Sequence, residues 1–206
     1  DILTNQNYIA NGTVIDKLLK SLIVTEGVDF NDILIGDKNA LMVAARILSY
    51  GKTYTIKVED EEVEVDLSKF TNKALKESEY EKGVNNFKFT LPKTDNQVTF
   101  KLLTHGEEQK IEREIKGLKK LNKTSSPEVT TRMKYILTSV NGITENKDIR
   151  EFVENDLLAI DSKAIREFYR AIAPDIDIAI TLEDPNTGDD FEVSLPIDLN
   201  FFWPGA

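Results

Sequence analysis

The side chains that most often carry enzymatic chemistry are sparse in this sequence. A single histidine, His105, stands beside Gly106 in an expected turn, where a surface or capping role is more common than general-base catalysis. The chain has no second histidine and no cysteine, which excludes His-based and Cys-based zinc sites and thiol catalysis. The Gly-rich nucleotide-binding motifs and the G-x-S-x-G motif of serine hydrolases are also absent. We therefore predict no catalytic residue and no cofactor.

Carboxylates are the one abundant reactive group, with 36 Asp and Glu residues. A pair of them could support glycoside hydrolysis, but such abundance makes any single pair uninformative. The acidic turns at 59–62 and 183–190 could each hold a hard cation such as calcium. In the second turn the EF-hand spacing fails, because an acidic ligand is missing before Gly188 and Leu195 occupies the twelfth position. We therefore predict no metal site.

The charge of the chain restricts the classes of partner. A net charge of −10 argues against nucleic-acid binding, which needs basic side chains to neutralise phosphates. No apolar run approaches the roughly 20 residues that span a membrane, so no membrane partner is expected. No Lys or Arg follows Arg170, whereas eight acidic residues do. This acidity is typical of a solvated sheet surface, and a surface that docks on a basic partner is the alternative.

The elements that would position any site are read from the spacing of apolar residues. Helices are predicted at about 14–23, 38–49, 107–121, 128–140, 147–155 and 161–173. Strand pairs are predicted at 54–58 with 63–67, 86–91 with 97–103, and 176–182 with 191–195. Asp37 and Asp161 are the expected N-caps of two helices. The order predicts an α+β fold of mixed helices and antiparallel β-hairpins, with a helical C-terminal half closed by a hairpin.

The segment 123–127 is the best candidate for a linker. It divides the chain into residues 1–123, with N-terminal helices and antiparallel hairpins, and residues 124–206, with a helical segment and the C-terminal hairpin. We expect these two parts to pack as one unit. Within the first part, the helix at 38–49 is apolar nearly all round and holds one interior charge, Arg46. A paired or snorkelling arginine is the favoured interpretation over a ligand-binding role.

Four residues near the C-terminus are the predicted partner-binding residues: Phe201, Phe202, Trp203 and Pro204. Leaving three consecutive aromatic side chains in water would cost about 1.5–3 kcal/mol each. They must therefore pack on the chain's own core or on a partner. Own-core packing is the default, and partner contact is the alternative because Phe and Trp are common interface anchors.

Short motifs concentrated in residues 33–67 and 128–206 carry a family resemblance. They are Gly36-Asp37-Lys38-Asn39-Ala40, Ala44-Ala45-Arg46-Ile47, Tyr50-Gly51, Thr131-Arg132-Met133-Lys134-Tyr135, Ser139-Val140-Asn141-Gly142, Asp148-Ile149-Arg150-Glu151-Phe152-Val153-Glu154-Asn155, Asp161-Ser162-Lys163-Ala164-Ile165-Arg166, Pro174-Asp175-Ile176-Asp177 and Phe201-Phe202-Trp203-Pro204. These motifs resemble the T4-type tailed-phage baseplate hub assembly protein family. The resemblance implies a non-enzymatic structural or chaperone-like assembly component of a contractile-tail baseplate hub, which acts by protein–protein binding.

The same resemblance implies other baseplate and tail hub proteins as partners, with multiple copies in a symmetric assembly as an open option. It implies a place in the tail baseplate of the virion, and in the host cytoplasm during assembly. Some relatives hold Cys pairs in their hairpin turns as zinc ribbons, but the absence of cysteine here leaves no zinc site to carry over. Two alternatives stay open. One is a hub-associated cell-wall hydrolase that uses a carboxylate pair, and the other is a chaperone that leaves before the virion matures.

Overall fold

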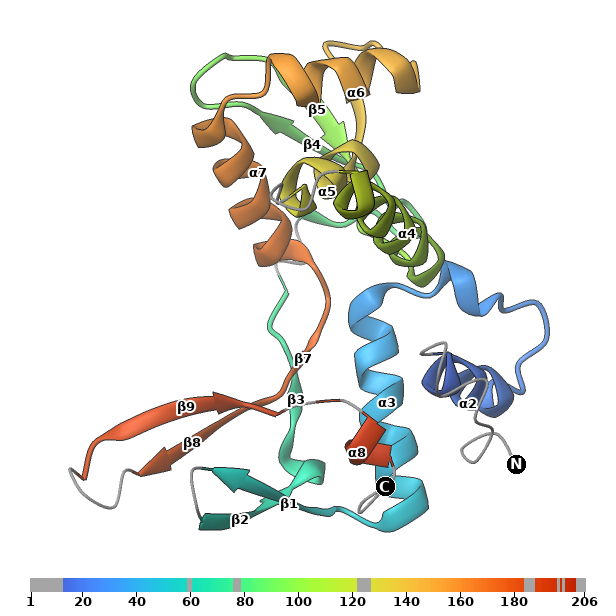
Figure 1. The fold of residues 1–206 in the computed structure, drawn as a ribbon, viewed down its shortest axis with the longest axis vertical. Helices are drawn as coiled ribbons and strands as arrows, with labels where there is room; N and C mark the ends of the chain where they lie inside the picture. Colours follow the sequence, from blue (N-terminus) through green and yellow to red (C-terminus); the bar gives the residue numbers. More distant parts are fainter. Residues whose placement is uncertain are drawn as a thin grey trace. The chain divides into compact units, whose positions relative to one another are not determined.

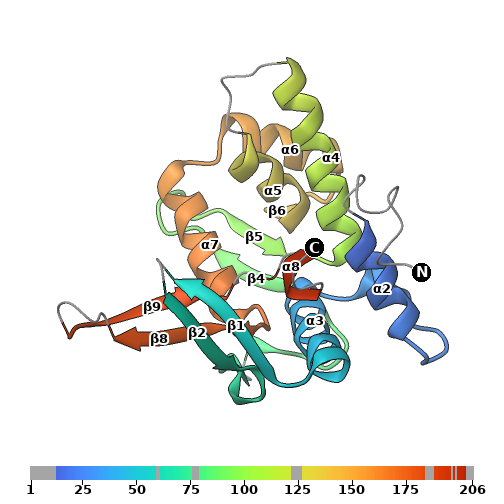
Figure 2. The same cartoon turned by 60° about the horizontal axis from the view of Figure 1, so that its bottom comes forward.

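The computed structural model describes residues 13–58, 61–75, 79–121, 127–183, 188–195, 197 and 199–202. The predicted α+β class is confirmed, because helices are interspersed with antiparallel strand pairs (Figures 1 and 2). The chain forms two compact units. The first contains residues 1–30, 36–73 and 175–206, and the second contains residues 31–35 and 74–174. The division expected between residues 123 and 124 therefore falls inside the second unit, where the helices on either side of it contact each other.

The first unit combines helices with three two-stranded antiparallel sheets. Its elements are α2 (Val14–Leu22), most of α3 (Ile35–Tyr50), β1 (Thr53–Val58), β2 (Glu61–Asp66), η2 (Leu67–Lys69), β3 (Thr71–Asn72), β7 (Ile176–Asp177), β8 (Ala179–Glu183), β9 (Asp190–Ser194) and α8 (Leu199–Phe202), together with the start of η1 (Phe30–Asp32). The pairs are β1 with β2, β3 with β7, and β8 with β9, so two of the three predicted strand pairings lie here.

The core of the first unit follows from the alternation of β1. Tyr54 and Ile56 point to the buried face, and their partners on β2 are Val65 and Val63. Apolar residues of α3 and α8 complete this core: Met42, Val43, Ala45, Phe201 and Phe202. Figures 1 and 2 both show the short α8 beside α3. A two-stranded sheet is marginally stable alone, so β1 and β2 depend on this packing.

The second unit is built on a three-stranded antiparallel sheet of order β4-β5-β6. The strands are β4 (Phe87–Thr90), β5 (Gln97–Phe100) and β6 (Leu137–Val140), and the helices are α4 (His105–Leu121), α5 (Glu128–Ile136), α6 (Asn146–Asn155) and α7 (Ala159–Ile172). Phe89 and Phe100 on the sheet make ring contacts with Phe168 of α7 at centroid distances of 5.0 and 5.8 Å. The predicted pairing of residues 86–91 with 97–103 and all four of these helices are present, with the largest change at one boundary.

That boundary is the end of the helix predicted at 128–140. The helix α5 stops at Ile136, and residues 137–140 form β6 instead. The strand pairs with β5 and adds a side-chain contact in which the hydroxyls of Thr99 and Ser139 lie 2.6 Å apart. Residues 137–140 therefore form a strand because they pair with the free edge of β5, although their apolar residues have helical spacing.

Both predicted N-caps are wrong for a common reason, which is that each helix begins two residues before its predicted cap. Asp37 lies in the first turn of α3, and Asp161 is the third residue of α7. Asp161 is fully buried and its carboxylate reaches a distant loop, where it accepts hydrogen bonds from the Lys93 amide at 2.8 Å and the Thr94 hydroxyl at 2.9 Å. Asp161 thus joins α7 to the loop between β4 and β5.

Two further expectations change in detail. The polar sequence of residues 68–85 predicts a loop with a helical turn at about 72–76, but Asn72 belongs to β3 and pairs with Ile176. Consequently residues 176–177 leave the last predicted hairpin, whose first strand begins at Ala179. Among the helices of the described ranges, none combines the length and the apolar character needed to cross a membrane.

Candidate functional site

The terminal aromatic residues were the predicted partner-binding site, and two of them lie in the described part of the chain. Phe201 and Phe202 are both buried in the core of the first unit. The Phe201 ring meets Tyr54 edge to face at a centroid distance of 5.0 Å, and it meets Phe202 at 5.2 Å. Phe201 and Phe202 therefore pack on the chain's own core. Trp203 and Pro204 lie outside the described residues.

The same core contains Arg46, which is only 4% exposed. Its Cζ atom lies near the centroids of three aromatic rings: Tyr50 at 4.7 Å, Tyr54 at 5.4 Å and Phe201 at 6.0 Å. Its Nη1 donates a long hydrogen bond of 3.4 Å to the Gly51 carbonyl, and its buried Nε has no hydrogen-bond partner. The side chain neither snorkels to the surface nor pairs with a carboxylate within the described residues.

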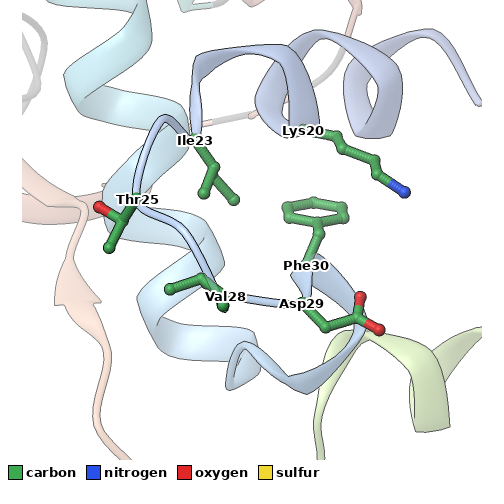
Figure 3. Close-up of a pocket in the computed structure, with 7 residues that line it drawn as sticks. Lys20, Ile23, Thr25, Val28, Asp29 and Phe30 are labelled. Atoms are coloured by element: carbon green, nitrogen blue, oxygen red, sulfur yellow. The ribbon is translucent and has the colours of Figure 1, made fainter.

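A pocket of about 460 Å³ lies where the chain leaves α2 and enters η1 (Figure 3). We call it the α2–η1 groove, and its lining residues are Lys20, Ile23, Thr25, Gly27, Val28, Asp29 and Phe30. The Ile23 and Phe30 side chains point into the space between the two helical segments (Figure 3). Beside it, Leu22, Val24 and Val28 are exposed, with Val24 at 90%. Exposed apolar side chains grouped around a concavity are typical of a protein-binding surface.

A second pocket of about 320 Å³ lies in the second unit, between the turn after β6 and helix α6. Its floor is apolar, and its rim carries three exposed carboxylates: Asp148, Glu151 and Asp156. This pocket bears on the hydrolase alternative. Catalytic carboxylates are usually held by hydrogen bonds in a partly desolvated cleft. The three rim carboxylates are exposed to solvent, and no hydrogen bond or ion pair orients their side chains within the described parts of the chain.

The best-organised polar cluster of the second unit joins helices α4, α5 and α6. Arg150 donates two hydrogen bonds to the Glu114 carboxylate, at 3.0 and 3.2 Å, and the Tyr135 hydroxyl donates a third at 2.9 Å. The hydrogen bonds from Arg150 hold the pKa of Glu114 below its ordinary value, with Tyr135 adding a smaller effect. Burial raises the pKa of the Tyr135 hydroxyl, and its bond to Glu114 raises it further. The Glu114 carboxylate thus joins α4 to Tyr135 of α5 and to Arg150 of α6, so the cluster connects helices.

The remaining sequence-predicted candidates are not brought together. His105 is buried as the first residue of α4, with its Nε2 atom 3.1 Å from Gln109 Nε2, so the expected surface turn is wrong. Residues 59–60 and 184–187 of the two acidic turns lie outside the described residues. Among the residues that the structure describes, no group of three or more His, Asp or Glu side chains could hold a metal ion.

Sequence reasoning missed the α2–η1 groove. Residues 23–30 come after the helical repeat of apolar residues in α2 and show no periodicity of their own. Their apolar residues therefore predicted no helix or strand. The available signal was the presence of Val24 and Val28 in a stretch with no predicted element, where apolar side chains have no core face to join.

A family model described as "T4 bacteriophage base plate protein" matches residues 3–203. No curated protein and no solved structure matches the chain.

Proposed function

Because the chain belongs to the T4 bacteriophage base plate protein family, we propose that it is a structural or chaperone-like assembly component of the contractile-tail baseplate hub. It acts by binding other hub proteins. As a baseplate protein it belongs in the tail baseplate of the virion, and its partners are other baseplate proteins. The hub position, the assembly role and the passage through the host cytoplasm are parts of the proposal.

The observation that carries the binding role is the α2–η1 groove. Val24 is almost fully exposed beside a cavity whose lining includes the Phe30 ring. Moving an exposed Val side chain out of water is worth about 1.5–3 kcal/mol. A partner that inserts an apolar side chain between Ile23 and Phe30 would cover this surface and gain that energy. The groove is therefore the proposed contact with a neighbouring hub protein.

A second proposed contact is the terminal segment. Because Phe201 and Phe202 fill the core of the first unit, deleting residues 200–206 would remove core packing as well as any anchor. A loss of binding after that truncation would therefore be ambiguous. The double variant Trp203→Ala/Pro204→Ala leaves both core rings in place. If this variant still co-purifies with hub proteins as wild type does, Trp203 and Pro204 are not the anchor.

The proposal is tested with an affinity-tagged full chain expressed during phage infection. Mass spectrometry of the captured material is expected to find the phage's baseplate hub proteins in fixed ratios to the tagged chain. Capture of no baseplate protein would contradict the proposal. The same analysis of mature virions separates the two forms of the role, because a resident subunit is present there and a transient chaperone is absent.

A further inference from the structure

Arg46 differs from the other well-packed arginines of the chain in lacking a counter-charge. Arg132 and Arg150 each donate two hydrogen bonds to a carboxylate, on Glu108 and Glu114. Arg46 is more buried than either and has no carboxylate partner in the described residues. Removing a charge from water without pairing it is strongly unfavourable. Within the described residues, the charge of Arg46 is therefore buried and only partly compensated.

The surroundings of Arg46 leave one edge of its guanidinium group unused. The group lies over the Tyr50 ring, and the rings of Tyr54 and Phe201 are also close, so cation–π contacts supply part of the missing stabilisation. The Nη1 atom is occupied by the Gly51 carbonyl, whereas Nε has no partner. The free Nε side of a guanidinium group is an edge at which a carboxylate binds through two parallel N–H···O bonds.

We propose that Arg46 is a binding site for a carboxylate group supplied by an Asp or Glu side chain of a partner protein. The carboxylate accepts a hydrogen bond from the unpaired Nε–H and supplies the missing negative charge. A monoanion matches the single charge of Arg46, whereas a phosphate dianion would leave excess negative charge in an aromatic site. The assignment of the carboxylate to a partner protein rests on the proposed function, whereas the existence of the site does not.

The path to the site passes Tyr50. This ring is the one closest to the Arg46 guanidinium group, it is 49% exposed, and it belongs to the last residue of α3. A residue at a helix end with half of its surface in water can change rotamer at low cost, because few neighbours restrain it. Movement of the Tyr50 side chain uncovers one face of the guanidinium group without displacing Tyr54 or Phe201, which are part of the core, and we infer that a carboxylate reaches the Nε edge from that side.

The site is tested directly by nuclear magnetic resonance of the Arg46 Nε–H group in the full chain. The Arg46→Lys variant identifies the signal by its loss. Sodium acetate is the probe, and sodium chloride at equal ionic strength is the control. We expect a saturable shift of the signal with acetate and none with chloride, and a several-fold lower half-saturating acetate concentration in Tyr50→Ala. Equal responses to the two salts, or no response in either protein, would overturn the proposal. A stronger response to phosphate than to acetate would overturn the choice of a carboxylate.

A second requirement concerns stability in chloride buffer. The Arg46→Met variant keeps an unbranched side chain of similar length but removes the buried charge, so its unfolding temperature is expected to equal or exceed that of wild type. A fall of several degrees would show that the charge is a structural part of the core, and the proposal would fail. Both measurements use the isolated chain. If the chain shows a saturable acetate response but captures no baseplate protein, the proposed site is supported and the proposed function is contradicted.

Discussion

The rings of Tyr54 and Phe201 meet edge to face, with their centroids 5.0 Å apart, and this contact ties the C-terminal α8 to strand β1. The two residues are 147 positions apart in the sequence, and both are buried in the first unit. Because β1 belongs to a two-stranded sheet, it needs packing partners from other elements. The short helix α8 is therefore a part of the core of this unit.

We expect Phe201→Ala to lower the free energy of unfolding by about 3–5 kcal/mol, because it leaves a cavity in a packed core. The matched control is Phe191→Ala, which removes the same side chain from a position that is 37% exposed. Its effect is expected to be much smaller, since surface substitutions usually change stability by about 0.5 kcal/mol or less. Urea unfolding at neutral pH measures both. Equal losses in the two variants would contradict the packing of Phe201.

The buried carboxylate of Asp161 gives a second prediction for stability. Asp161→Ala leaves the Lys93 amide and the Thr94 hydroxyl without their acceptor. Both bonds are partly buried, so losing them is expected to cost about 1–3 kcal/mol of unfolding free energy. Asp156→Ala is the control, because Asp156 is exposed at the end of α6. A chain that tolerates Asp161→Ala as well as Asp156→Ala would contradict the role of Asp161 as a link.

The Glu114–Arg150 pair predicts a dependence of stability on pH. Hydrogen bonding to Arg150 lowers the pKa of Glu114 from its ordinary value of 4.5 in the folded chain. Because the pKa of Glu114 is lowered in the folded chain, the contribution of the pair to stability is fully present above the pKa of Glu114 in the unfolded chain. This contribution is lost as the pH falls through the pKa of Glu114 in the folded chain. The unfolding free energy of Glu114→Gln should therefore lie about 1 kcal/mol below wild type at pH 7, and the gap should close below pH 4. A gap that is constant over this range would contradict the pairing.

The class of fold was predictable from sequence because most helices and hairpins carry their own periodicity. The exceptions depend on residues far apart in the chain. Residues 137–140 have the apolar spacing of a helix, but β5 offers them a strand partner about 40 positions away. Asp161 has the chemistry of an N-cap, yet its acceptor atoms are used by a loop 67 or 68 positions away. Local pattern cannot reveal either contact.

The candidate site was only partly predictable. The sequence singled out Arg46 as the one charge inside an apolar helix, but the aromatic rings around it come from β1 and α8 as well as α3. The free-energy cost of exposing Phe201 and Phe202 to water favoured packing on the chain's own core, and both side chains are buried there. Val24 and Val28 stand out in the sequence as apolar residues outside any predicted element, but no local pattern indicates a cavity there, because the shape of a loop depends on tertiary packing.

The hydrolase alternative leads to a separate prediction. Purified protein is expected to cause no clearing of a peptidoglycan suspension, because the three carboxylates of the second pocket are exposed and no side chain among the described residues orients them. A lysozyme reaction run in parallel shows that the substrate is intact. Clearing by the wild-type chain that disappears in Glu151→Gln would contradict the binding role and support the hydrolase.

The central claim is that the chain works by binding baseplate hub proteins through the α2–η1 groove. The most direct test co-expresses the tagged chain with the other hub proteins of the phage and measures the retained complex by size-exclusion chromatography. Val24→Asp is expected to lose most of the complex, because it places a charge on the apolar surface. Leu121→Asp, at a residue that is 87% exposed in the other unit, is the matched control and is expected to retain it. Full retention by Val24→Asp would contradict the claim, as would a wild-type chain that elutes alone.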